Sequence, residues 1–300
     1  MFFVVDNKCT ENYYIVNLCD YKSFYNMLTK SKPKVSVLIP IFNAEEFITD
    51  TISAVLAQTY SDFELILLDD ASTDKTEEIV KSFTDERIVY ARNTENLGIS
   101  ANRNKLIGMA QGEYIAVLDH DDICLPNRLE MQVNFLDKHQ DIAMIGSWFE
   151  LRCPKTSPLW RRIITNLGWV WCHPLYPSWD DLWKGNVMMH PTIMYRRKIF
   201  TDLGITYRAE YSPAEDYDLV RQAMEHNLRI ANLPQILLKY NLHGNNWSLV
   251  KKEAMEKADH KIKREIAKKF GKNRDWFYPY CLVMAEKLRL KFMVREDYDV

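Results

Sequence analysis

Four short apolar runs in the first half of the chain alternate with segments whose apolar residues recur at helical spacing. The first run, "VSVLIPI" at 35–41, is apolar almost throughout and rich in β-branched residues, as in a strand that is buried on both faces. Strands that alternate with helices predict a parallel sheet with right-handed crossovers. We therefore expect an α/β fold with strands at 35–41, 63–70, 87–92 and 113–118, and helices at 43–58, 72–83, 99–112 and 126–139, with the regular pattern breaking after 142–148.

Local signals predict where these helices begin and end. Glu45 and Glu46 would occupy the first turn of helix 43–58, where the helix dipole favours acids. Ser72 or Thr73 would cap helix 72–83. Gly112 would close helix 99–112, and Pro126 would open the helix that follows the fourth strand.

Composition and charge narrow the class of protein. The 300 residues carry a net charge of −2, with 47% hydrophobic and 27% charged residues, which is ordinary for a soluble globular protein and argues against a nucleic-acid partner. No apolar run reaches the roughly 20 residues that a membrane helix needs. The start, "MFFVVDNKCTENYY", lacks the basic region of a signal peptide. The six cysteines have no metal-ligand spacing and are expected to be free thiols, so we expect a cytoplasmic protein.

Three parts follow one another along the chain: an N-terminal extension at 1–33, a main domain at 34–247, and a helical, basic segment at 248–300. The residues of the extension suggest no role for it. The basic segment is interpreted either as a solvated helix face or as a surface attracted to an anionic membrane.

The segment 151–190 breaks the regular pattern and gathers tryptophans. It contains Trp160, Trp169, Trp171, Trp179 and Trp183. Large aromatic side chains are usually buried, so these residues either form the core of a second lobe or form a wall against which a ligand stacks.

Acidic residues follow two of the predicted strands. Asp69 and Asp70 end the second strand, and Asp119, Asp121 and Asp122 follow the fourth. Ligands of open α/β sheets bind beyond the carboxyl ends of the strands. Nearby carboxylates repel one another, so they either cap a helix, here the one near Pro126, or hold a cation. The placement favours Mg²⁺ or Mn²⁺ shared with a substrate diphosphate.

A second acidic group, Glu215, Asp216 and Asp218, precedes a helical run. These acids are either favoured by the helix dipole or include a general base that removes a proton from an attacking hydroxyl. The segment after the first strand, "PIFNAEE", contains no glycine. The sequence therefore argues against a dinucleotide dehydrogenase, and it has no P-loop motif.

Three stretches together resemble the family 2 glycosyltransferases, over residues 34 to about 245. They are "VSVLIPIFNAEEFITDTISAVLAQTYSDFELILLDDASTDKT", "NTENLGISANRNKLIGMAQGEYIAVLDHDDICLPNRLE" and "HPTIMYRR…AEDYDL". The resemblance implies the GT-A fold, a Rossmann-like, mostly parallel sheet flanked by helices. It also implies transfer of a sugar from a nucleotide-diphosphate donor with inversion, assisted by Mn²⁺ or Mg²⁺. Residues 34–150 would form the donor half and 151–247 the acceptor half.

The resemblance also implies roles for individual residues. Asp216 would be the catalytic base, and the metal would be held by Asp121 with Asp119 and His243. Asp122 would be a loop or cap residue. The donor side would comprise Pro40, Asp69, Asp70, Gly98, Arg103, Asn104, Asp119 and His120. The acceptor side would comprise Glu215, His190, Trp169 and Trp171. The alternative to a site role for His190 is a structural one, as a histidine satisfied by local hydrogen bonds.

Two other functions remain open at this point: a metal-dependent nucleotidyltransferase, and a nucleotide-sugar-binding protein without turnover. The nucleotide is expected to be UDP, by its frequency in the family. The expected acceptor is a glycan or a lipid-linked saccharide of the cell surface, and the basic C-terminal helices would bring the enzyme to the inner membrane face. Fold alone does not settle the substrate.

Overall fold

The computed structural model describes residues 2–6, 13–17, 32–153, 170–243, 246 and 250–270. The chain divides into two units, Met1–Pro33 and Lys34–Val300. In the first unit, β1 (Phe2–Asp6) and β2 (Tyr13–Asn17) form an antiparallel hairpin. Everything below concerns the second unit.

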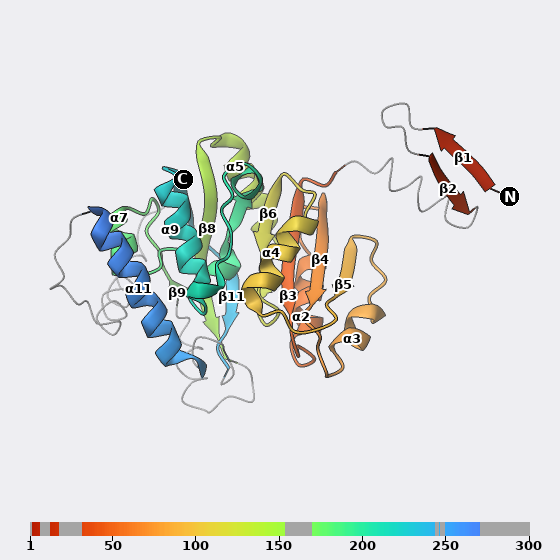
Figure 1. The fold of residues 1–300 in the computed structure, drawn as a ribbon, viewed down its shortest axis with the longest axis horizontal. Coiled ribbons are helices and arrows are strands. Elements are labelled where there is room, and N and C mark those ends of the chain that lie inside the picture. Colours follow the sequence, from red (N-terminus) through yellow and green to blue (C-terminus); the bar gives the residue numbers. More distant parts are fainter. Residues whose placement is uncertain are drawn as a thin grey trace. The chain divides into compact units, whose positions relative to one another are not determined.

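The donor-side strands form the parallel part of one sheet (Figure 1). In it, β3 (Val35–Ile41) pairs with β4 (Phe63–Asp69) on one side and β6 (Tyr114–Val117) on the other, and β5 (Ile88–Arg92) pairs with β4. The connecting helices are α2 (Ile48–Leu56), α3 (Thr76–Ser82), α4 (Ile99–Met109) and α5 (Arg128–Lys138). The predicted order of strands and helices is confirmed.

The sheet continues through strands from the second half of the chain, in the order β5-β4-β3-β6-β10-β8-β11-β7. β10 (Met194–Arg196) is antiparallel to both neighbours, and β8 (Ile142–Arg152) and β11 (Arg229–Asn241) run parallel to each other. The short strands β7 (Ile123–Cys124) and β9 (Val170–Trp171) pair with β11 and β8. The remaining helices are α7 (Trp179–Lys184), α8 (Lys198–Thr201), α9 (Glu215–Glu225), α11 (Lys252–Phe270) and the short 3₁₀ helices η1 (His190–Thr192) and η2 (Ala209–Tyr211).

Both faces of the sheet are covered, as the apolar character of its strands predicts. On β3, Leu38 belongs to the apolar cluster that includes residues of α4, α9 and α11, while its neighbours Val37 and Ile39 belong to a second cluster that includes residues of α2 and α5. Alternate residues of a strand point to opposite faces, so a strand buried on both sides needs apolar residues at nearly every position. This fold is the mixed α/β, mostly parallel sheet with flanking helices that the sequence predicts.

Two predicted helix starts are wrong, for one shared reason. Helix α2 begins at Ile48, after Glu45 and Glu46, and α3 begins at Thr76 rather than at Ser72. The polar side chains ahead of them bind across the two loops instead. The Glu45 carboxylate accepts from the Lys75 amide, and the Ser72 hydroxyl accepts from the amide of Asn43. These side chains join two neighbouring loops. A capping rule that considers only one helix and its flanking residues cannot predict such bonds.

Gly112 does not cap α4, which ends at Met109. A Cβ atom at Gly112 would lie 2.6 Å from the Ser36 amide nitrogen and 2.8 Å from the Val35 carbonyl carbon. Glycine is needed here for a close backbone approach rather than for a left-handed turn. The prediction that Pro126 opens a helix also shifts, because α5 begins at Arg128.

The tryptophan-rich and basic segments are described in part. Trp179 and Trp183 of α7 pack against the apolar cluster beneath α9 and α11, which favours the core interpretation for these two. Trp160 and Trp169 lie outside the described residues, as do 271–300. Among the described helices, none combines the length and the apolar character that crossing a bilayer requires.

A pair of glycines tests the packing argument. Replacing Gly112 with alanine should lower the free energy of unfolding by roughly 1–3 kcal/mol, because backbone atoms have to move apart. Replacing Gly108, which has open space around it within α4, should instead stabilise the protein by up to about 1 kcal/mol. Urea denaturation measures both; equal effects of the two substitutions would contradict the close approach at Gly112.

Candidate active site

The site lies at the carboxyl ends of the parallel strands, where β6 leads into the acid loop, residues 119–122. Helix α2 fixes this loop, since the Thr51 hydroxyl donates to the backbone carbonyls of His120 and Asp122. Asp122 is fully buried and accepts from the Asn241 amide at 2.9 Å, so it ties the loop to the end of β11. It does not cap α5, whose N-cap position is Asn127. Burial and the neighbouring carboxylates raise the pKa of Asp122 well above its usual range.

Arg103 connects the two predicted acidic groups. Its guanidinium donates to Asp119 at 3.0 Å and to Glu215 at 2.7 Å. Arg103 comes from α4, Asp119 from the acid loop and Glu215 from the first turn of α9, so three segments meet at one cation. Arg103 and Glu215 are buried. Removing either member of a buried ion pair destabilises the protein strongly, because the other charge is left without a partner.

Asp119 is held as a carboxylate. Burial alone would raise the pKa of Asp119, but the adjacent His190 ring and the Arg103 charge outweigh it and hold the pKa well below its usual range. The Nδ1 atom of His190 lies 3.7 Å from the Asp119 carboxylate, and Nε2 bonds the Tyr207 hydroxyl at 2.8 Å. Nε2 of His190 is thus satisfied by Tyr207, whereas its buried Nδ1 has no hydrogen-bond partner in the described part of the chain and faces the Asp119 carboxylate.

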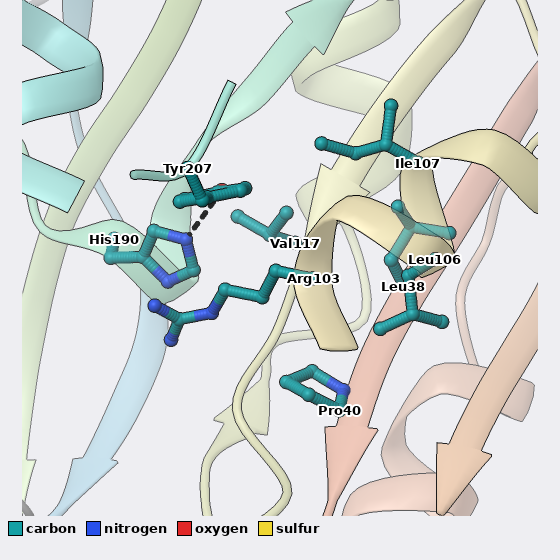
Figure 2. Close-up of a pocket in the computed structure, with 8 residues that line it drawn as sticks. All are labelled: Leu38, Pro40, Arg103, Leu106, Ile107, Val117, His190 and Tyr207. Atoms are coloured by element: carbon teal, nitrogen blue, oxygen red, sulfur yellow. Dashed lines mark hydrogen bonds between the residues drawn. The ribbon is translucent and has the colours of Figure 1, made fainter. Parts of the chain in front are cut away.

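A small pocket adjoins this group (Figure 2). It is lined by Pro40, Arg103, His190 and Tyr207 and by the apolar side chains of Leu38, Leu106, Ile107 and Val117. Figure 2 shows the side chains of Arg103, from α4, and His190, from η1, next to each other, and it draws the His190–Tyr207 bond. The pocket places Pro40 and Arg103, two of the predicted donor-side residues, at one cavity.

Asp121 faces His243 across the acid loop. The carboxylate and Nε2 of the ring are 2.8 Å apart, and the ring stacks on Phe47 with centroids 4.8 Å apart. The His243 amide donates to the Asn246 side chain, and Asn241 bonds the backbone of Asp121, so the end of β11 and the bond to Asn246 place the ring.

The Asp121–His243 pair fits a divalent cation that takes its remaining ligands elsewhere. Within the described part of the chain, no three metal-ligating side chains converge. Magnesium-type sites often use one or two protein ligands, with the rest from substrate phosphates and water. A carboxylate suits Mg²⁺ and Mn²⁺, and the imidazole nitrogen favours the softer Mn²⁺.

The carboxylates of Asp69 and Asp70 accept hydrogen bonds from other groups of the protein. Asp69 is fully buried and accepts from the Ser72 amide and the Tyr90 hydroxyl. Asp70 accepts from the Asn93 side chain and from the amides of Leu97 and Gly98. Gly98 has a φ of 82°, which favours glycine, and it begins α4. The pair therefore shapes the loop that positions Arg103.

Asn104 also acts within the protein. Its amide donates to the Tyr207 carbonyl and accepts from the Tyr207 amide and the Thr206 hydroxyl. It thereby fixes the tyrosine that bonds His190. His120 contributes its backbone carbonyl to the Thr51 bond, as described above.

Asp216 begins α9 beside Glu215 and remains half-buried. Burial raises its pKa, and Glu215 adds to this, while His190 and Arg103 oppose it. A carboxylate with a raised pKa holds a proton more readily, as a general base requires. The Asn186 side chain donates to Asp216 at 2.9 Å.

The sequence reasoning missed Asn186, Asn241 and Tyr207. Asn186 and Tyr207 each bond a predicted site residue. None of the three belongs to a sequence motif that would have identified it.

Trp171, predicted for the acceptor side, lies on β9 in a group of aromatic rings and packs against the apolar core. It stacks near Phe149 with centroids 6.1 Å apart, and Phe149 in turn contacts Tyr240, the residue before Asn241. This aromatic group therefore sits at the same end of the sheet as the acid loop. The second predicted acceptor-side tryptophan, Trp169, lies outside the described residues.

Comparison with known proteins agrees with this geometry. The sequence model of the family described as "Glycosyl transferase family 2" matches residues 36–204. An uncharacterized glycosyltransferase of Haemophilus influenzae is 33% identical over 241 residues, covering 78% of this chain and 73% of the relative. TuaG of Bacillus subtilis, named for teichuronic acid biosynthesis, is 29% identical over 265 residues, with 88% of this chain and 100% of the relative covered.

A shorter match is to WfgD of Escherichia coli, named a UDP-Glc:alpha-D-GlcNAc-diphosphoundecaprenol beta-1,3-glucosyltransferase. It is 41% identical over 114 residues, with 38% of this chain and 45% of the relative covered.

Solved structures establish the fold. S. aureus TarS in complex with UDP-GlcNAc superposes with a TM-score of 0.61 at 21% identity, over 87% of this chain and 73% of that one. The mannosyltransferase PcManGT from Pyrobaculum calidifontis, in complex with GDP-Man and Mn²⁺, has a TM-score of 0.54 at 15% identity, over 92% and 88%. The chain belongs to glycosyltransferase family 2 and is a glycosyltransferase with the GT-A fold.

Proposed function

We propose that this enzyme transfers a hexose or N-acetylhexosamine from a UDP-sugar to a hydroxyl of a lipid-linked saccharide, with inversion. The observation that carries the proposal is the Arg103 bridge, because it holds Asp119 of the acid loop and Glu215, the neighbour of Asp216, at one point. The UDP-GlcNAc complex of TarS supports the donor class, and the lipid-linked acceptor in the name of WfgD supports the acceptor class.

The proposed reaction is a single displacement at the anomeric carbon. Asp216 takes the proton as the acceptor O–H bond breaks, and the acceptor oxygen forms its bond to the anomeric carbon from the face opposite the diphosphate. The bond from that carbon to the diphosphate oxygen breaks at the same time, and UDP departs with the electron pair. Arg103 lies close to the developing negative charge, where a buried cation stabilises it best. Pro40 and the loop held by Asp70 would lie beside the nucleotide.

Asp121, Asp119 and His243 would hold Mn²⁺ or Mg²⁺. When bound, such an ion supplies Lewis-acid stabilisation of the departing diphosphate. His243 would be positioned for this ion by its stacking on Phe47 and by the bond from its amide to the Asn246 side chain.

Helix α11 offers a surface for the membrane that would carry such an acceptor. Ala258, Ile262 and Ile266 face the core. The exposed side carries the basic stripe Lys257, Lys261, Arg264 and Lys268, spaced so that all four lie on one helix face. Basic side chains near an anionic bilayer contribute about 1 kcal/mol each. We propose peripheral binding at the cytoplasmic face of the inner membrane through this stripe.

The role of Asp216 is tested by Asp216→Asn. The amide cannot take the proton, so kcat should fall by roughly 10²- to 10⁴-fold. UDP affinity, measured by calorimetry, should stay within about twofold, because the substitution is isosteric. Asp202→Asn, at an exposed position, is the control and should retain activity. Turnover by Asp216→Asn close to that of the native enzyme would remove Asp216 from this role.

The metal proposal is tested by His243→Ala. Loss of a ligand should weaken Mn²⁺ binding in the presence of UDP by about tenfold or more, as followed by electron paramagnetic resonance. The exposed His226 provides the matched control, and His226→Ala should bind Mn²⁺ like the native protein. Equal Mn²⁺ affinity in both variants would show that His243 does not contact the ion.

The membrane proposal is tested by changing all four stripe residues to glutamine. Binding to vesicles containing anionic phospholipid, measured by co-sedimentation, should fall at least about tenfold, and native binding should weaken as salt rises. A control with glutamine at Lys75, Lys81, Lys138 and Lys198, exposed elsewhere, removes the same charge. Equal loss in both variants would mean that only net charge matters.

A further inference from the structure

The proposed base has one fixed hydrogen-bond donor that comes from the acceptor half of the chain. Asn186 follows the end of α7, and its side-chain nitrogen donates to Oδ2 of Asp216 at 2.9 Å. The orientation of this amide is determined by a second bond, because the Met188 amide donates to Oδ1 of Asn186 at 3.3 Å. An amide flip would break that bond and turn an acceptor toward the carboxylate. The NH₂ group therefore faces Asp216.

The position of Asn186 is held independently of this bond. The Tyr217 hydroxyl, one residue after Asp216, donates to the Leu182 carbonyl of α7. Leu182 and Tyr217 are both buried in the apolar cluster, as are Val187 and Met188 on the other side of Asn186. The segment that carries the amide is thus joined to α9 by packing and by a separate hydrogen bond. Asn186 is held in place before it contributes anything to Asp216.

We propose that Asn186 is a positioning residue for the base, holding Oδ2 of Asp216 so that Oδ1 is left to receive the proton of the acceptor hydroxyl. This inference rests on the proposed role of Asp216. A donor to a carboxylate binds the charged form more strongly than the protonated form. Asn186 should therefore act in two ways: it selects the oxygen that faces the acceptor, and it keeps Asp216 ionised despite its burial.

The other groups that face Asp216 are charged or can become so. They are Glu215 on the same helix, Arg103 from α4, His190 from η1, Tyr195 from β10 and Tyr207. Glu215 and Arg103 neutralise each other through their ion pair. Asn186 is neutral at all relevant pH values, so replacing it with alanine changes the hydrogen bond without changing net charge. That makes its effect on the pH profile of activity interpretable.

The test is the pH dependence of kcat in Asn186→Ala and Asn186→Asp. Loss of a hydrogen bond to a charged group should lower kcat at neutral pH by roughly tenfold to a hundredfold in the alanine variant. The pKa of Asp216 should rise further, so the acid limb of the profile should move up by about one pH unit. Activity needs the ionised form, and the variant should therefore recover part of its loss as pH rises. The KM for the donor should stay within about twofold, since the amide contacts the base.

The aspartate variant keeps the shape of the side chain but replaces the donor with a carboxylate. Two carboxylates at this distance cannot both ionise readily, so its acid limb should move further than that of the alanine variant. Ser178→Ala is the matched structural control. It removes the capping box of α7, in which Ser178 and Asp181 bond each other. It should lower thermal stability and leave the acid limb where the native enzyme has it.

The outcomes separate this inference from the function on which it rests. If Asp216→Asn is inactive but neither Asn186 variant moves the acid limb, Asn186 is not a positioning residue and the role of Asp216 stands. If Asp216→Asn retains turnover, the proposed base itself is wrong. A shift of equal size in Ser178→Ala would assign the effect to α7 as a whole and overturn the role of the amide.

Discussion

One buried cation, Arg103, makes the arrangement of this site possible. Asp119 and Glu215 come from segments far apart in the sequence; Glu215 is buried and Asp119 is partly buried. Two carboxylates brought together without a cation would repel each other, and one would take up a proton. Arg103 shares its guanidinium between them and so allows α9 to begin beside the acid loop. The acid loop and the start of α9 meet because their charges are balanced at this point.

Three aspartates in this part of the molecule differ in the direction of their pKa shifts because their surroundings differ. Asp119 is held ionised by its basic neighbours, whereas burial pushes the pKa of Asp122 and Asp216 upward. Asp122 is enclosed and bonded to the end of β11, so it serves structure. Asp216 is only partly buried, and its raised pKa fits the proposed role as a base. Residue type alone does not distinguish these three aspartates; the depth and the partners of each do.

The sequence predicts the donor half of the fold well because its signals are local. Strands such as 35–41 are buried on both faces, and that burial requires the apolar runs that identify them. The acid loop was found for a similar reason, because it directly follows β6. Helix starts were predicted less well, since Ser72 and Glu45 bond to a neighbouring loop rather than to their own helix. Bonds such as Asn186 to Asp216 and Asn241 to Asp121 join distant segments with no motif between them, so they emerge only from the folded chain.

The antiparallel strand β10 has a consequence for how substrates are accommodated. It lies between β6, which leads to the acid loop, and β8, to which the aromatic strand β9 is paired, so a continuous hydrogen-bonded ladder connects the acid loop to the aromatic group around Trp171. Enzymes that assemble their chemistry by closing two lobes gain or lose reactivity with the hinge angle. On the assignment proposed above, the spacing between the metal-binding residues and the base would be established once, when the chain folds. A new acceptor preference can then arise by remodelling the peripheral segments, while this frame keeps its dimensions.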